Sequence, residues 1–269
     1  MTSRYPFSSY PSSWYRIDLA RNILIGKLNL YQYFGKSLVC TRDTDGKVIL
    51  QDGRTLLGNS IHYPIHEANG IVFAYHSDTP QTPDFDIPEI DEFRDPQWSK
   101  VRTINYQATS HVQEFVENAV DTGHFVTVHQ MPSIPNVEKF ELMGRTFAFQ
   151  SVGNRKVLGF NTSMDIRVRP VGLAVIIGWT LTRMLEVRNV HCVTPINESR
   201  VQISVSYVFK KNWNPLRTFI LHLILNRALY NFTSPDLPIF AEKKYIQKPM
   251  LCGKDGPIAR VRHWAQQFY

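Results

Sequence analysis

One segment in the second half of the chain, SRVQISVSYVFKK, constrains the fold most strongly. Apolar residues occupy every second position from Val201 to Phe209, and Gln202, Ser204 and Ser206 lie between them. Because successive side chains of a strand point to opposite faces, this alternation predicts a strand with one buried face and one face toward water. A strand of that kind is typical of an antiparallel sheet.

Helical and strand-like segments surround this strand. A long apolar helix is expected over LRTFILHLILNRALYNF, residues 216–232, lying across the sheet. Upstream, HVQEFVENAVDTGHF has apolar residues at helical spacing, and RTFAFQSV and DIRVRPVGLAVIIG are further strand candidates. The order predicts the α+β class, with a curved antiparallel sheet gripping a helix.

The first 95 residues have the pattern of short strands joined by turns. Gly35 supplies a turn within YQYFGKS, and Asp45-Gly46 lies between two strand-like segments, which is a strong hairpin signal. GIVFAYHSD predicts a buried strand, whereas the proline-rich and acidic stretch TPQTPDFDIPEIDEF cannot form a ladder. We therefore expect a small β-subdomain over residues 1–95 and a larger domain over residues 96–269.

The charge pattern and the cysteines narrow the function classes. The formal net charge is +7, but lysines and arginines are scattered in ones and twos, which argues against nucleic-acid binding. The sequence shows no apolar run of about 18 residues and no signal-like N-terminus, so neither a membrane span nor secretion is expected. Three cysteines far apart in the sequence exclude a disulfide framework and fit a reducing cytoplasm.

The segment ENAVDTGHFVTVH carries the residues best suited to chemistry. Asp121 and His124 are three positions apart, which on a helix puts them on one face. His124 and His129 are five apart, about 140° out of line on an ideal helix, so the helix must end or bend if they are to meet. Two imidazoles and a carboxylate would form a facial triad for Fe(II).

A simpler interpretation stays open at this point. The chain has nine histidines, so a pair at this separation can arise by chance, and an aspartate near a histidine is often only its hydrogen-bond partner. No His-Glu-x-x-His motif, no Gly-x-Ser-x-Gly motif and no glycine-rich phosphate loop competes with the histidine segment for the active site.

Several motifs resemble those of one enzyme family. The pattern N-x-x-D-x-x-H-F-x-x-V-H is similar to the mononuclear-iron motif of the Rieske-type non-haem iron oxygenases. The C-terminal segment DLPIFAEKKYIQKPMLCGKDGPIARVRHWAQQFY resembles the branch of 3-ketosteroid 9α-hydroxylases and cholesterol 7-desaturases, as do PSSWYRI, YFGKSLVCTRDTDGKV, NGIVFAYHSD and HCVTPINESRV. The resemblance covers nearly the whole chain.

The resemblance implies a set of site residues. The family's iron ligands fall on His124, His129 and Asp236, and the aspartate on the route of electrons from a neighbouring cluster falls on Asp121. Asp121 would also orient His124, and Asn118 would line the mouth of the site unless it serves packing. Asp236 departs from the family pattern, because Pro235 precedes it; a plain residue in the first turn of a helix is the alternative.

The family's cluster-binding segment is missing from the sequence. Members carry C-x-H and C-x-x-H pairs for a two-iron Rieske cluster, whereas this chain has no cysteine between Cys40 and Cys192. We therefore expect a mononuclear Fe(II) and no iron–sulfur cluster, in a β-subdomain shortened near Asp52.

Three functions follow from these expectations. The first is the catalytic subunit of an oxygenase, hydroxylating or oxidatively modifying an apolar, steroid-like substrate with O2. Its electrons would come from a Rieske centre on a partner chain, or from a ferredoxin and a reductase, in a ring-shaped hetero-oligomer. The second is an iron enzyme that acts by Lewis acidity. The third is a non-catalytic structural or ligand-binding subunit of a mixed oligomer.

Overall fold

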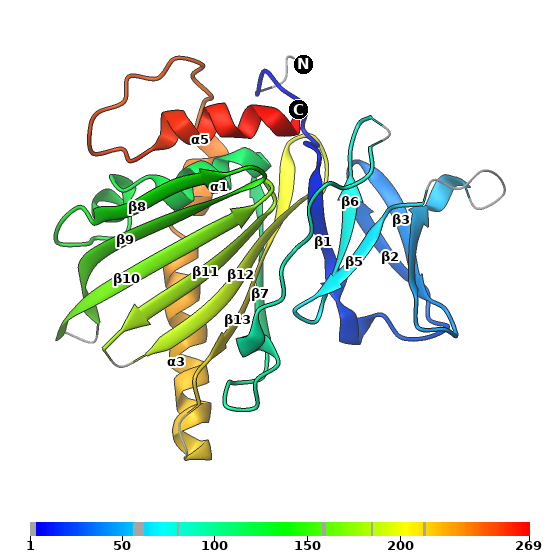
Figure 1. Ribbon diagram of the computed structural model, residues 1–269, viewed down its shortest axis with the longest axis horizontal. Coiled ribbons are helices and arrows are strands. Elements are labelled where there is room, and N and C mark those ends of the chain that lie inside the picture. The colour runs from blue at the N-terminus through cyan, green and yellow to red at the C-terminus, as the bar shows by residue number, and fades with distance from the viewer. Residues whose placement is uncertain (1–3, 56–61, 80, 158–159, 184, 212–213) are drawn as a thin grey trace.

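The computed structural model describes residues 4–55, 62–79, 81–157, 160–183, 185–211 and 214–269. Its largest element is a seven-stranded antiparallel sheet with the order β7-β13-β12-β11-β10-β9-β8 (Figure 1). The predicted α+β class is confirmed. The strands of this sheet are β7 (Arg102–Thr109), β8 (Asn136–Met143), β9 (Thr146–Val157), β10 (Phe160–Val171), β11 (Val175–Thr182), β12 (Glu186–Pro195) and β13 (Arg200–Phe209).

The alternating segment forms β13, which pairs antiparallel with β12 and β7 as predicted. Its polar face is not solvated, however, because Ser204 and Ser206 are buried. Arg16, on β1 (Ser13–Leu19), donates a hydrogen bond to the hydroxyl of Ser204, and the hydroxyls of Ser206 and Thr103 lie 2.9 Å apart. The expectation of one wet face was wrong, since the N-terminal strand covers it.

The expected single strand DIRVRPVGLAVIIG is two strands. β10 ends at Val171 and β11 begins at Val175, and these two residues pair across the turn. Gly172 has a φ of +64° in this turn, a conformation that glycine adopts without the steric cost of a side chain. The continuous apolar run concealed the turn because both strand ends are buried.

The long helix α3 (Pro215–Thr233) forms where the sequence predicts it, and the side chain of Asn214 caps its N-terminus. It crosses behind the large sheet in Figure 1. Leu225 packs with Val187 on β12 and with Phe209 on β13. The opposite face of the helix is open, and the side chain of Leu216 is 65% exposed.

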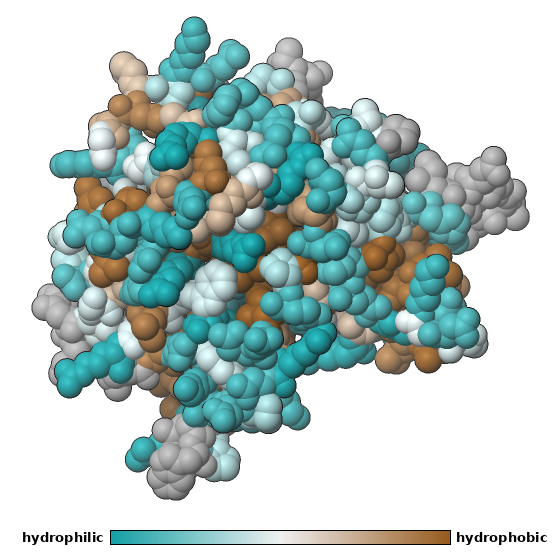
Figure 2. All heavy atoms as spheres, viewed as in Figure 1, coloured by the Kyte–Doolittle hydropathy of each residue, from teal (hydrophilic) through white to brown (hydrophobic). Residues whose placement is uncertain are grey.

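The N-terminal part contains two three-stranded sheets, with the orders β1-β6-β5 and β2-β3-β4, at the right of Figure 1. Gly35 and Gly46 take positive φ in the turns before and after β3, so both predicted turns are confirmed. Figure 2 shows hydrophobic surface on this side of the molecule. The strands are β2 (Asn29–Tyr33), β3 (Lys36–Arg42), β4 (Val48–Asp52), β5 (Ile65–Ala68) and β6 (Ile71–His76).

The hydrophobic core is continuous between the two expected parts. One buried cluster joins Tyr15 and Leu38 of the N-terminal strands to Val116, Phe147 and Val205 of the large domain. The acidic stretch before residue 96 contains a short 3-10 helix, Asp91–Phe93, and no strand among its described residues. The division near residue 95 stays a prediction.

Four shorter α-helices complete the described part of the fold. They are α1 (Val112–Val120), α2 (His124–Thr127), α4 (Asp236–Glu242) and α5 (Ile258–Ala265). A search of the described residues finds no helix with the length and apolar character needed to cross a membrane.

Candidate metal centre

The two histidines of the sequence motif flank the end of a short helix. α1 ends at Val120, and α2 starts at His124 and ends at Thr127, before His129. The helix therefore ends between the two histidines, which is what their spacing requires if the rings are to meet. Asp121 is the C-cap of α1 in an extended conformation, so the expected shared helix face of Asp121 and His124 was wrong.

The fold brings three potential ligands together. One ligand atom each from His124, His129 and Asp236 lies within 4.8 Å of the other two. The Nε2 atom of His129 is 3.6 Å from Oδ1 of Asp236, and the centroids of the two imidazole rings are 4.9 Å apart. Asp236 comes from α4, more than 100 positions along the chain, so tertiary structure alone closes this triangle.

A backbone carbonyl fixes the orientation of His124. The Nδ1–H of this ring donates a hydrogen bond to the carbonyl oxygen of Asp121 at 2.5 Å, which leaves Nε2 with its lone pair. The Asp121 carboxylate instead accepts from the backbone amides of Gly123 and His124, at 3.0 and 3.3 Å. The ring is therefore oriented through the main chain of Asp121, not through the carboxylate that the sequence suggested.

His129 is held by stacking on an aromatic ring. Its centroid lies 4.0 Å from that of Phe232 on α3, with 12° between the ring planes, and the guanidinium of Arg155 lies over the same phenyl ring. The Nε2 atom of His129 is buried, and no hydrogen-bond partner for it occurs among the described residues. A buried polar atom without a partner costs free energy, and a bound cation would satisfy it.

Asp236 is the first residue of α4 and is 7% exposed. Burial raises the pKa of its carboxyl to about 7, and the hydrogen bond from the side chain of Asn118 opposes this shift. Asn118 thus contacts the third candidate ligand. The alternative role of Asp236 as a residue of the first helical turn describes its position correctly but leaves its burial beside two imidazoles unexplained.

The electrostatics of the three groups suit a cation. Burial, with the neighbouring charges of His124 and Arg155, lowers the pKa of His129 to about 4, and burial also lowers the pKa of His124. Both rings are therefore neutral near pH 7, which is the form that coordinates metals. The residues present fit a divalent metal of the kind that two histidines and one carboxylate hold.

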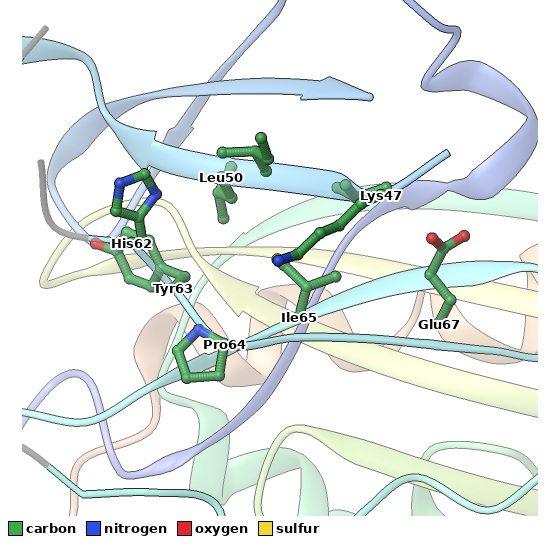
Figure 3. Close-up of a pocket in the computed structure, with 9 residues that line it drawn as sticks. Lys47, Leu50, His62, Tyr63, Pro64, Ile65 and Glu67 are labelled. Atoms are coloured by element: carbon green, nitrogen blue, oxygen red, sulfur yellow. The ribbon is translucent and has the colours of Figure 1, made fainter. Parts of the chain in front are cut away.

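Described residues line two hollows in the surface of the protein. A hollow of about 400 Å³ is lined by His129, Gln130, Pro132 and Arg155, so it leads to the candidate ligands. A groove of about 640 Å³ lies between β4 and β5 in the N-terminal part (Figure 3). The residues labelled there are Lys47, Leu50, His62, Tyr63, Pro64, Ile65 and Glu67.

Sequence reasoning missed three residues that support the triad. Phe232 stacks on His129 and Arg155 lies over the ring of Phe232, but one residue lies within an apolar helix and the other in a strand, so no local pattern marks them. Arg262 on α5 donates to both carboxylate oxygens of Glu117 on α1, at 3.0 and 2.8 Å. Of these three residues, only Arg262 could have been found from the sequence, because it lies in the C-terminal segment that resembles the family.

Comparisons with known proteins identify relatives of this chain, structures with a similar fold and the family to which the chain belongs. Curated relatives include the oxygenase component of a 3-ketosteroid-9-alpha-monooxygenase from Rhodococcus rhodochrous, 25% identical over 97% of this chain and 84% of the relative. A second relative is the cholesterol 7-desaturase of Xenopus laevis, also 25% identical, over 97% of this chain and 72% of the relative. The first alignment spans 320 positions for a chain of 269 residues, so several tens of its positions have no counterpart here.

Solved structures share the architecture. The structure of dicamba monooxygenase bound to 3,6 dichlorosalicylic acid superposes with a TM-score of 0.73 at 14% identity, over 96% of this chain and 97% of that one. The terminal oxygenase of carbazole 1,9a-dioxygenase from Nocardioides aromaticivorans gives a TM-score of 0.65 at 14% identity, over 98% and 96%.

A family model describes most of the chain directly. The 3-ketosteroid 9alpha-hydroxylase C-terminal domain matches residues 74–269, which include α1 to α5 and the whole seven-stranded sheet. The resemblance read from the motifs is confirmed. The curated relatives of this chain are named as oxygenase components of monooxygenases and as a desaturase, and the chain belongs to the 3-ketosteroid 9alpha-hydroxylase C-terminal domain family.

Proposed function

We propose that His124, His129 and Asp236 hold a mononuclear Fe(II), and that this chain is the oxygenase component that uses it. The observation that supports this most directly is the buried Nε2 of His129, which has no hydrogen-bond partner in the described part of the chain and lies 3.6 Å from a carboxylate oxygen of Asp236. Fe(II) held by two imidazoles and one carboxylate keeps coordination positions open and supplies the redox chemistry of non-haem oxygenases.

The surrounding residues prepare this site for its ion. The carbonyl of Asp121 keeps the proton of His124 on Nδ1, so that Nε2 is the coordinating atom. Phe232 restricts the ring of His129 to one plane, and Asn118 holds the carboxylate of Asp236. Because these contacts position the three side chains, less ordering is required when a metal binds.

The electrons are proposed to come from another protein. A Rieske cluster needs two cysteines at one place, whereas Cys40 is buried in β3, Cys192 is buried in β12 and Cys252 is exposed in the C-terminal segment. A Rieske-type partner chain, or a ferredoxin with its reductase, is the expected donor. Asp121 is the proposed entry point, since its carboxylate accepts a hydrogen bond from the backbone amide of His124.

The proposed substrate is an apolar polycycle of the steroid class. The relatives are named for 3-ketosteroids and cholesterol, and the hollow beside His129 offers access to the triad. The proposed reaction is a hydroxylation, or a desaturation that begins in the same way.

Iron binding is the first test. Wild-type protein titrated anaerobically with Fe(II) is expected to bind one ion per chain, and His124→Ala and Asp236→Ala are expected to lose that site. His263→Ala is the matched control, because His263 is an exposed histidine on α5. Equal iron content in the wild type and in His124→Ala, with both folded, would remove the proposed iron site.

Turnover assays distinguish the proposed oxygenase from a Lewis-acid enzyme and from a structural subunit. Iron-loaded protein is expected to oxidise a 3-ketosteroid or cholesterol with O2 only when a Rieske-type donor and a reductase are supplied. Conversion of a substrate by the isolated chain without any reductant would favour a Lewis-acid enzyme. Stable association with a Rieske-containing oxygenase, without iron uptake, would favour a structural subunit.

A further inference from the structure

The three residues that join α1 to α2 are covered by the C-terminal segment of the chain. Thr122 is 2% exposed, and its hydroxyl donates a hydrogen bond to the carbonyl of Lys254 at 2.8 Å. A Cβ placed on Gly123 would lie 3.4 Å from that same carbonyl oxygen and 3.4 Å from Oδ1 of Asp255. The backbone immediately before His124 therefore packs directly on residues 254–255.

Gly256 makes the closest approach. Its φ is +66°, and a Cβ at this position would lie 2.1 Å from the carbonyl oxygen of Val120, the last residue of α1. Two backbones therefore meet where no side chain fits, because a larger residue would have to displace a carbonyl rather than a flexible side chain. By contrast, a Cβ at Gly253 would meet nothing within 4 Å.

The turn that carries Gly256 is itself ordered. The amide of Asp255 donates to the carbonyl of Cys252 at 3.1 Å, and the carboxylate of Asp255 accepts from the amide of Cys252 at 2.7 Å. We call residues 252–256 the tail clamp. The tail clamp leads into α5. The buried Trp264 of α5 donates a hydrogen bond to the carbonyl of Gly144 at 2.7 Å, so the C-terminal end of the tail clamp is also fixed to the large domain.

A second contact ties the same tail to α1. Arg262 on α5 forms a bidentate ion pair with Glu117, one turn before Asp121, and Glu117 is 2% exposed. α1 is therefore held from the tail both along its last turn and at the point where it ends. Along the chain, Asp121 follows the residues of α1 that make these contacts and precedes α2, and its carbonyl orients His124.

We propose that the tail clamp positions His124 for iron, so that Gly256 and Thr122 determine the affinity for Fe(II) without coordinating it. This rests on the proposed iron site. These two residues act through the backbone of Val120–Gly123: if that backbone moves, the Asp121 carbonyl no longer aligns the ring of His124. Contacts that orient metal ligands typically change metal affinity by about 10- to 100-fold when they are removed.

The test compares two glycines of one turn. In anaerobic titrations, Gly256→Ala is expected to bind Fe(II) about 10-fold more weakly than the wild type or worse. Gly253→Ala is expected to bind it unchanged. Backbone amides 120–124 of metal-free Gly256→Ala should exchange hydrogen faster than in the wild type, while the thermal midpoint measures the cost to the fold as a whole. Folded Gly256→Ala with wild-type affinity and wild-type exchange would overturn the proposal.

Thr122 gives a second, independent comparison in case Gly256→Ala does not fold. Thr122→Val removes the hydrogen bond to Lys254 at nearly constant volume, and Thr122→Ser keeps it. Thr122→Val should weaken Fe(II) binding several-fold and alter the electron paramagnetic resonance spectrum of the Fe(II)–nitric oxide adduct, and Thr122→Ser should restore both. Wild-type affinity and spectrum in Thr122→Val would also overturn the proposal.

The two failures can be told apart. If the wild type itself binds no iron, the proposed function fails. If the wild type binds iron, His124→Ala loses it and the tail variants keep it, then the iron site stands and only the positioning role of the tail clamp is refuted.

Discussion

The side-chain amide of Asn118 faces the carboxyl of Asp236, and it opposes the burial that raises the pKa of that carboxyl. α1 therefore does more than lead into the histidine segment, because it also holds the aspartate that arrives from α4. The three candidate ligands belong to two segments distant in sequence, and α1 contacts both.

Removal of the Asn118 amide should weaken metal binding without unfolding the protein. We expect Asn118→Ala to bind Fe(II) about 10-fold more weakly, because the carboxylate of Asp236 loses the donor that orients it. Anaerobic titration gives the affinity and thermal unfolding gives the stability. Asn231→Ala, at an exposed asparagine of α3, is the control and should behave like the wild type. Unchanged affinity in Asn118→Ala would show that the amide of Asn118 has no role in the site.

The stacking of His129 on Phe232 supports a second prediction. Phe232→Ala should lower the free energy of unfolding by about 2 kcal/mol, roughly half the cost of removing a fully buried phenylalanine, since Phe232 is half-buried. It should also weaken Fe(II) binding, because the ring of His129 loses its neighbour at 4.0 Å. Phe232→Leu keeps most of the volume but not the aromatic face. Wild-type affinity in Phe232→Leu would mean that volume, not stacking, holds His129.

The ion pair between Arg262 and Glu117 should contribute strongly to stability. Arg262→Met leaves a carboxylate that is 2% exposed, with the side-chain amide of Gln113 at 2.8 Å and the ammonium of Lys243 at 3.8 Å as neighbours, so we expect a loss of about 3 kcal/mol in chemical denaturation. The double variant Glu117→Gln/Arg262→Met should recover part of this loss, because it removes the unpaired charge. A double variant that is no more stable than Arg262→Met alone would contradict the role of charge.

His111 predicts an acid-sensitive contribution to stability. Burial lowers its pKa to about 4, against the opposing effects of its hydrogen bond to the carbonyl of Ser8 and of the Glu117 charge; its other neighbours are the rings of Tyr5, Phe7 and Tyr269. The neutral ring caps α1, because its Nδ1 accepts from the amide of Gln113 at 3.1 Å. A proton on Nδ1 would end that contact.

The unfolded chain therefore binds this proton more readily than the folded one. The contribution of His111 is present in full above its ordinary pKa of about 6.5 and is lost as the pH falls toward 4, by ~1–3 kcal/mol. His111→Asn keeps a capping side chain but removes the titration. Unfolding free energies measured between pH 7.5 and 4 should fall less steeply for His111→Asn than for the wild type. Parallel curves would exclude His111 as a source of the acid sensitivity.

Local pattern in the sequence determined the secondary structure and the candidate ligands. The alternation from Val201 to Phe209 specifies a strand, Gly35 and Gly46 specify turns, and the spacing of His124 and His129 requires a helix end between them. These features depend on backbone geometry over a few residues, which the sequence encodes directly. Asp236 was identified only through its motif.

Tertiary structure decided which distant segments meet. Ser204 is buried because Arg16 on β1 reaches it, His129 is fixed by Phe232, and the backbone before His124 rests on Gly256. No periodicity reveals these contacts, since each joins residues about a hundred or more positions apart and depends on how whole elements pack. The local sequence therefore marks the two histidines, whereas the common geometry of the three candidate ligands arises only when the sheet, α3 and the C-terminal tail pack together.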